Sequence, residues 1–191
     1  DVPDYDFTGL NSRSFEQFVQ ALAAQLFGPT LMIFGDGPDG GREATFDGPT
    51  TYARGGEQWK GYGVVQAKFR QKPEGSTKDA KWALNQLSNE LKAYEERGSK
   101  RRMPKYYIFV TNVVLGSPAG GGKDAVWRRL TEFKNDNGLE DVDVWDYDKL
   151  RVFVDTFEGI RTTYAAWITS GDVLSMLRKQ LQSVRADFDD I

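Results

Sequence analysis

Three polar residues on two predicted strands are the strongest candidates for chemistry in this sequence. Gln66 and Lys68 are two positions apart in a predicted strand that begins at residue 62. Glu43 lies earlier in the chain, in a short predicted strand that follows a glycine-rich turn. Because successive side chains of a strand point to opposite faces, Gln66 and Lys68 share one face. An amide and an ammonium on a buried sheet face are expected to meet an anion or a metal ion. With Glu43 beside them, they predict a site that holds a divalent cation and a phosphate together, which is nuclease chemistry.

The residue types that the chain lacks narrow the chemistry further. Its 191 residues include no Cys and no His, which excludes zinc sites built from these ligands and catalytic centres that need a His base. Metal or acid–base chemistry must therefore use carboxylates, Lys, Tyr or bound water, and oxygen ligands favour Mg²⁺ or Mn²⁺. The apolar runs are too short to cross a bilayer and the chain opens without a signal sequence, so we expect a cytoplasmic protein with no membrane contact.

Hydrophobic periodicity predicts the elements that must position these residues. It indicates helices over 12–26, 77–97 and 123–135, and strands over 31–34, 42–46, 62–70, 105–115 and 142–145. We expect 31–34 to be buried, 47–61 to be a loop, and the strands on either side of this loop to pair as a hairpin. Beyond residue 147 the pattern is helical only, over 148–157 and 162–184. This order predicts an α/β domain around a mixed sheet.

Several short segments carry a further pattern. They are Phe15-Glu16, Gly37-Pro38-Asp39-Gly40-Gly41-Arg42-Glu43-Ala44, Val64-Val65-Gln66-Ala67-Lys68, Tyr107-Ile108-Phe109-Val110-Thr111-Asn112 and Val144-Trp145-Asp146-Tyr147-Asp148-Lys149-Leu150. Their order and spacing resemble the restriction-endonuclease-like superfamily with the PD-(D/E)xK site, and most closely its Mrr-type branch. The resemblance implies a nuclease domain over 1–160, with a mixed β-sheet core in the order αβββαβ plus αβ, flanked by helices. Residues 161–191 are then expected to be a C-terminal helical extension toward a region outside this fragment.

The resemblance also implies roles for the candidate residues. Glu43 is expected to be the principal ligand of Mg²⁺ or Mn²⁺, in place of the Asp that is more common in this branch. The backbone carbonyl of Ala67 would be a second ligand, and Gln66 would bind the metal or orient metal-bound water. Lys68 would hold the attacking water and stabilise charge in the transition state.

Two further acids have two interpretations each. Asp39 is either another metal ligand or a turn residue that bonds its own backbone between Pro38 and Gly40. Glu16 lies at the edge of the apolar stripe of its helix, where it either reaches the metal as an outer ligand or faces solvent.

The function expected from these residues is Mg²⁺-dependent cleavage of double-stranded DNA, and the resemblance implies that the products are a 5′-phosphate and a 3′-hydroxyl. The chain also resembles the N-terminal effector nucleases of bacterial STAND-type NTPases of antiphage defence, which implies low specificity and homo-oligomers formed through regions outside this fragment. Candidate DNA contacts are Arg42, Arg70, Lys72 and Lys78. The net charge of the chain is −3, so a basic surface that binds DNA would cover only part of the molecule. The alternative is a nuclease-fold module that binds nucleic acid or protein without cutting.

Three weaker signals have structural alternatives. Tyr52, Trp59 and Tyr62 would either stack on bases or pack the predicted hairpin. The basic run over 97–105 is either part of a DNA-binding groove or solvated surface. The segment 116–123 is rich in glycine, but it departs from the spacing of a phosphate-binding loop, so we expect a flexible loop.

Overall fold

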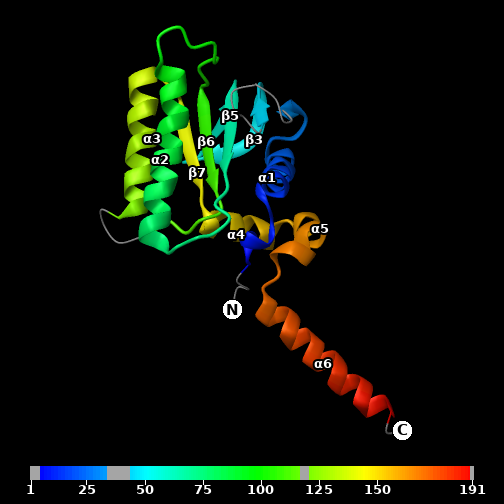
Figure 1. Cartoon of the computed structure of the whole chain (residues 1–191). Coiled ribbons are helices and arrows are strands. Elements are labelled where there is room, and N and C mark those ends of the chain that lie inside the picture. Colours follow the sequence, from blue (N-terminus) through cyan, green and yellow to red (C-terminus); the bar gives the residue numbers. More distant parts are fainter. Residues whose placement is uncertain (1–4, 34–43, 117–120, 190–191) are drawn as a thin grey trace.

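The computed structural model describes residues 5–33, 44–116 and 121–189, which form a mixed α/β structure (Figure 1). The helices are α1 (Ser12–Phe27), α2 (Ser76–Glu95), α3 (Gly122–Asn137), α4 (Tyr147–Thr156), α5 (Glu158–Ile168) and α6 (Gly171–Asp189), with 3₁₀ turns at Phe7–Gly9 and Gly28–Thr30. The strands are β1 (Leu31–Ile33), β2 (Ala44–Phe46), β3 (Pro49–Arg54), β4 (Glu57–Lys60), β5 (Gly63–Lys68), β6 (Tyr106–Thr111) and β7 (Asp141–Trp145). No helix within these described ranges is long and apolar enough to span a membrane.

The main sheet has five strands in the order β1-β2-β5-β6-β7. One half is antiparallel, since β2 pairs with both β1 and β5, and the other half is parallel, since β6 pairs with both β5 and β7. Helices α2 and α3 cover one face of the sheet, and α1 lies against the other (Figure 1). The expected mixed sheet is therefore confirmed, and so is the antiparallel pairing of the strands on either side of 47–61.

Strand β5 divides the hydrophobic core into two parts. Val65 and Ala67 belong to the cluster around α1, whereas Val64 belongs to the cluster under α2 and α3. Helix α1 is fixed at its start by a capping box: the Ser14 backbone N–H donates to the Asn11 side chain at 2.9 Å, and the Asn11 backbone N–H donates to Ser14 Oγ at 2.8 Å. The two faces of one strand therefore serve two different helical layers.

The segment 47–61 is a β-hairpin and not the expected loop. Strands β3 and β4 pair around Gly55 and Gly56, whose φ angles of 61° and 86° suit a tight two-residue turn. Burial alternates along β3, and the Trp59 ring of β4 stacks on Tyr106 with the ring centroids 4.6 Å apart. Alternating side chains beside a Gly-Gly pair are the hairpin signal that the prediction missed. The three candidate base-stacking residues are all buried, so their role is packing; they are Tyr52, Trp59 and Tyr62.

Tyr52 ties this hairpin to the far strand of the main sheet. Its hydroxyl donates a hydrogen bond to the Asp143 carboxylate of β7 and accepts one from Trp145 Nε1 at 3.1 Å. Burial, together with the neighbouring carboxylate, raises the pKa of Tyr52, so the hydroxyl keeps the proton that it donates. Arg54 adds an ion pair with Asp141 at 2.8 Å. These contacts fix the hairpin over the α1 side of the sheet.

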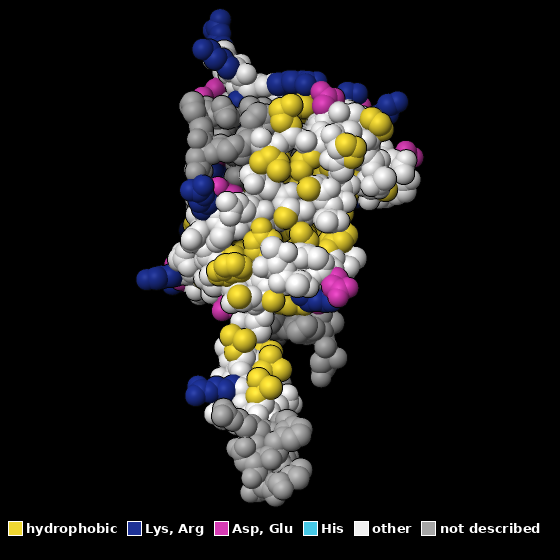
Figure 2. Space-filling model, turned by 90° about the vertical axis from the view of Figure 1, so that its right-hand side faces the viewer, with side chains coloured by type: hydrophobic (Ala, Val, Ile, Leu, Met, Phe, Trp, Pro, Cys, Tyr) yellow, Lys and Arg dark blue, Asp and Glu magenta, His cyan; other side chains and the backbone are white. Residues whose placement is uncertain are grey.

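Two other predictions about the elements are wrong. The strand at 31–33 is an exposed edge: Met32 and Ile33 are 61% and 53% exposed, because β2 is its one neighbour among the described strands. The helical pattern over 162–184 is broken into α5 and α6, because the backbone is extended at Thr169 and Ser170 caps a new helix. Helical periodicity hides such a break when apolar residues continue at similar spacing on both sides. Hydrophobic side chains of α6 remain at the surface (Figure 2).

We predict that Tyr52→Phe lowers the free energy of unfolding by about 1–3 kcal/mol, because the buried Asp143 carboxylate and the Trp145 N–H lose a hydrogen-bonding partner. Urea unfolding followed by circular dichroism measures this change. Tyr164→Phe is the matched control, since the Tyr164 hydroxyl makes no hydrogen bond within the described residues and its loss is expected to cost less than about 0.5 kcal/mol. Equal losses in the two variants would contradict the role given to the Tyr52 hydroxyl.

Candidate active site at the end of strand β5

Strand β5 extends past the described part of its neighbour β2 by three residues, which are Gln66, Ala67 and Lys68. The register pairs Ala44, the first described residue of β2, with Val65, whereas β6 continues beside β5 through Lys68. Gln66 is fully buried and Ala67 nearly so, and the Lys68 side chain is 24% exposed. The division of the core confirms the predicted alternation: Ala67 faces α1, and Gln66 and Lys68 face the α2 layer.

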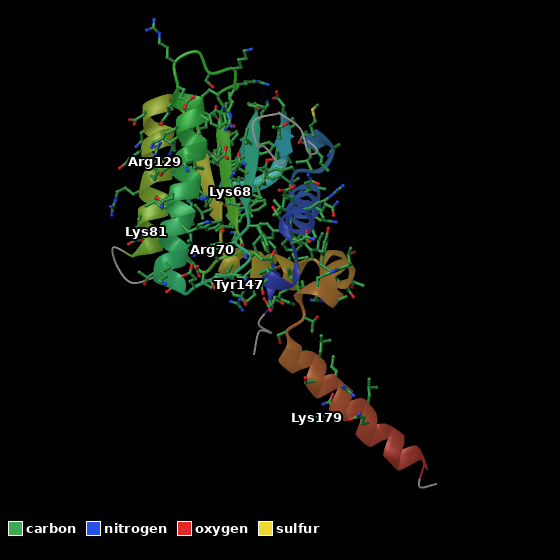
Figure 3. The ribbon with its side chains drawn as sticks, viewed as in Figure 1. Lys68, Arg70, Lys81, Arg129, Tyr147 and Lys179 are labelled. Carbon is green, nitrogen blue, oxygen red and sulfur yellow. The ribbon has the colours of Figure 1, made fainter. Side chains whose placement is uncertain are left out.

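A cavity of about 240 Å³ lies at this end of β5. It is lined by the first turns of α1, the end of β5 and the first half of α2, through Ser12, Phe15, Glu16, Ala67, Lys68, Phe69, Trp82 and Gln86. Glu16, Ala67 and Lys68 are candidates from the sequence, and the structure brings them to one place. Figure 3 shows Lys68 and Arg70 following one another along the chain at the end of β5. Glu16 is partly buried where it lines this cavity, and its role as an outer metal ligand stays a prediction.

Lys68 meets an anion inside the protein, and that anion is Glu90 of α2. Lys68 Nζ lies 2.6 Å from Glu90 Oε1, and the guanidinium of Arg101 lies 2.9 Å from Glu90 Oε2. The Glu90 side chain is only 15% exposed, so two cations share one carboxylate in a region with little water. Removing the carboxylate would leave both cations partly buried and without this charge partner. The polar face of β5 therefore has an anionic partner supplied by the fold.

Sequence reasoning missed Glu90. Trp82, Gln86 and Glu90 recur every four positions, which places them along one stripe of α2 that faces the end of β5. The signal in the sequence is weak, because a glutamate in an amphipathic helix is usually solvated. Its contact with Lys68, across 22 positions of the chain, is what makes it part of the site.

The chain leaves β5 through a fixed corner. Asn112 Oδ1 accepts a hydrogen bond from the Arg70 backbone N–H at 2.7 Å, and its amide donates to the Arg70 carbonyl at 2.9 Å, which extends the pairing of β5 with β6. The Arg70 guanidinium forms ion pairs with Glu74 and with the buried Asp79, the latter at 2.7 Å. Arg70 is thus engaged within the protein, where it holds the loop before α2 against the end of β5.

Three exposed lysines lie in the segment that leads into α2 and in its first two turns. Lys72, Lys78 and Lys81 are exposed, and Lys78 also pairs with Glu74 at 3.0 Å. The backbone of the basic run 97–105 precedes β6 and lies at the opposite end of the sheet from the cavity (Figure 1), although the Arg101 side chain reaches back to Glu90. Of the candidate DNA contacts, Lys72 and Lys78 therefore lie at the surface, before α2 and in its first turn.

The described oxygen atoms near Lys68 are of the kind that a hard cation such as Mg²⁺ binds, but they are too few to form a complete metal site. Glu16, Glu90 and the backbone carbonyl of Ala67 offer the ligand atoms that Mg²⁺ prefers. Within the described ranges, no group of three or more acidic residues converges. The remaining candidates from the sequence lie outside the described residues: Asp39, Arg42 and Glu43.

Comparison of the chain with protein-family models, with curated proteins and with solved structures gave no match in any of the three. The interpretation of this site therefore depends on its own residues and geometry.

We predict that Glu90→Gln lowers the free energy of unfolding by about 1–3 kcal/mol, because Lys68 and Arg101 lose their shared carboxylate. Glu95→Gln on the same helix is the matched control. Its pair with Arg129, at 2.9 Å, has a more exposed carboxylate and is expected to contribute less than about 1 kcal/mol. Urea unfolding measures both changes. Were Lys68→Met to cost the same with and without Glu90→Gln, the two residues would not be coupled.

Proposed function

We propose that this chain is a Mg²⁺-dependent DNA endonuclease domain with the restriction-endonuclease fold. The observation that carries the proposal is the cavity where Glu16 of α1 meets Ala67 and Lys68 of β5. A carboxylate and an ammonium from separate elements are groups that phosphodiester hydrolysis uses. The mixed sheet also supports the proposal, because the strand with the Gln-Ala-Lys motif lies between an antiparallel and a parallel neighbour.

Lys68 is the proposed catalytic residue among those described. Water attacks phosphorus in line with the leaving O3′ atom, which takes up a proton, so the products are a 5′-phosphate and a 3′-hydroxyl. The Lys68 ammonium would donate hydrogen bonds to the phosphoryl oxygens, whose negative charge grows in the transition state. Glu90 is a positioning residue, since its carboxylate holds Lys68 Nζ at 2.6 Å.

The proposed cation ligands come from three segments. Glu43 would be the principal ligand, with the Ala67 carbonyl, Gln66 and Glu16 completing or orienting the shell, and Asp39 remains a further candidate. When bound, Mg²⁺ or Mn²⁺ supplies a water of lowered pKa and polarises the phosphoryl group. Glu16, which lines the cavity, would also orient water there through its carboxylate oxygens.

The proposed substrate is double-stranded DNA, bound through its phosphates. Lys72, Lys78 and Lys81 lie at the surface where the chain enters α2, and lysines at such positions attract phosphate without reading sequence. Low sequence specificity follows from this mode of binding. The resemblance to effector nucleases of antiphage defence supports the further proposal that the domain acts in the cytoplasm as part of a larger bacterial protein, which would control when it cuts.

We predict that Lys68→Ala lowers the rate of Mg²⁺-dependent plasmid cleavage by about a hundredfold or more, because the transition state loses a charged donor. Agarose gels of supercoiled, nicked and linear plasmid measure the rate with purified protein. Lys92→Ala is the control, since it removes an exposed lysine in the last turn of α2 that has no proposed role in binding or catalysis, and it should keep most of the activity. Undiminished cleavage by Lys68→Ala, with circular dichroism showing a folded protein, would remove the assignment.

The ion pair between Lys68 and Glu90 favours a second candidate function. In that case Lys68 stabilises the fold, and the chain is an inactive nuclease-fold module that binds nucleic acid or protein. Calorimetric titration with Mn²⁺ separates the two. The endonuclease is expected to bind the ion at least about tenfold more weakly after Glu43→Gln, because a ligand charge is lost. Binding that is absent, or unchanged by Glu43→Gln, would support the inactive module.

A further inference from the structure

Helix α6 carries a row of exposed leucines. Leu174, Leu177 and Leu181 are 49%, 49% and 71% exposed. They are spaced by three and then four positions, and the sequence continues the same spacing with Val184, Phe188 and Ile191. This is the a and d pattern of the heptad repeat, in which Leu174 occupies a and Leu177 occupies d. Figure 2 shows hydrophobic side chains following one another along the first turns of this helix.

The row is narrow, and its width distinguishes between two kinds of partner. A helix that packs on a globular core carries apolar residues at a, d and also e or g, whereas a coiled-coil helix uses a and d alone. After the first turn of α6, the e and g positions are polar, with Arg178 at e and Gln180 at g. The row therefore fits another helix better than it fits the broad apolar surface of a globular domain.

The position of α6 leaves room for such a partner. The helix follows a break in the chain at Thr169 and Ser170 and extends away from the sheet and the other helices (Figure 1). It has 19 residues, so it is about 28 Å long at 1.5 Å per residue. A single helix of this length is only marginally stable in water, and burial of its leucines would stabilise it.

We propose that α6 is a coiled-coil helix through which copies of this chain associate in parallel. A second copy presents the same narrow row, so the leucines of each helix can fill the spaces between those of the other. In an antiparallel pair, e positions face e positions, which would bring Arg178 of one copy toward Arg185 of the other. In the parallel arrangement, Arg185 at e meets Gln180 at g of the other copy, which avoids the repulsion between like charges. This inference holds whether or not the domain cuts DNA.

The first test is the mass of the chain in solution, measured by light scattering over a wide range of concentrations. We expect at least twice the chain mass of 21.5 kDa at high concentration. The double variant Leu177→Glu/Leu181→Glu should remain at the mass of one chain, because charges replace the apolar row. Lys179→Glu/Gln182→Glu, on the opposite side of α6, is the control and should associate like the original chain. A single-chain mass for the original protein, or an unchanged mass for the leucine variant, would overturn the proposal.

The second test reads the orientation. The sequence contains no Cys, so a single introduced thiol reports one position. In a parallel pair, two Leu177→Cys side chains lie opposite one another at d, and mild oxidation should give a covalent dimer on a non-reducing gel. Lys179→Cys points away from the partner and should cross-link much more slowly. Equal rates for the two variants, or no cross-link through Leu177→Cys, would rule out the parallel arrangement.

Discussion

The packing of strand β5 on both of its faces is the constraint on which the rest of the structure depends. Ala67 on one face belongs to the core around α1, and Val64 on the other belongs to the core under α2 and α3. Toward the end of the strand the α2 side meets Gln66 and Lys68 instead of apolar residues. A covered sheet tolerates such groups only when the layer above supplies partners, and Glu90 supplies one for Lys68.

The same arrangement connects the stability of the domain with its proposed chemistry. Apolar residues at these positions would pack against α2 without any cost of burying charge, so a buried amide and a shared carboxylate are not what stability alone would favour. Proteins depart from the arrangement that best stabilises the fold mainly at functional sites. The polar residues that stability alone does not explain lie beside the cavity lined by Glu16 and Lys68. One of these two residues comes from each side of the end of β5.

Contacts around the sheet hold this region in a defined geometry. Asn112 and Arg70 extend the pairing of β5 with β6, and Asp79 fixes the following loop to the start of α2. The β3–β4 hairpin is held by Tyr52 on the α1 side of the sheet. Helix α6 differs from this body, because its row of leucines is exposed in the single chain, and we propose that a second copy covers it. Catalysis and assembly would therefore use separate parts of the molecule.

The sequence by itself determined what depends on local geometry. Helices predicted at 12–26, 77–97, 123–135 and 148–157 agree with the structure to within two residues at each end, and the shared face of Gln66 and Lys68 follows from the period of a strand. Only the tertiary structure decided which distant residues meet. Glu90 reaches Lys68 across 22 positions, Tyr52 of the hairpin reaches Asp143 of β7 across 91 positions, and β1 is exposed because it lies at the edge of the sheet. Periodicity is a property of neighbouring residues along the backbone, whereas these contacts depend on how whole elements pack, which no short window of sequence contains.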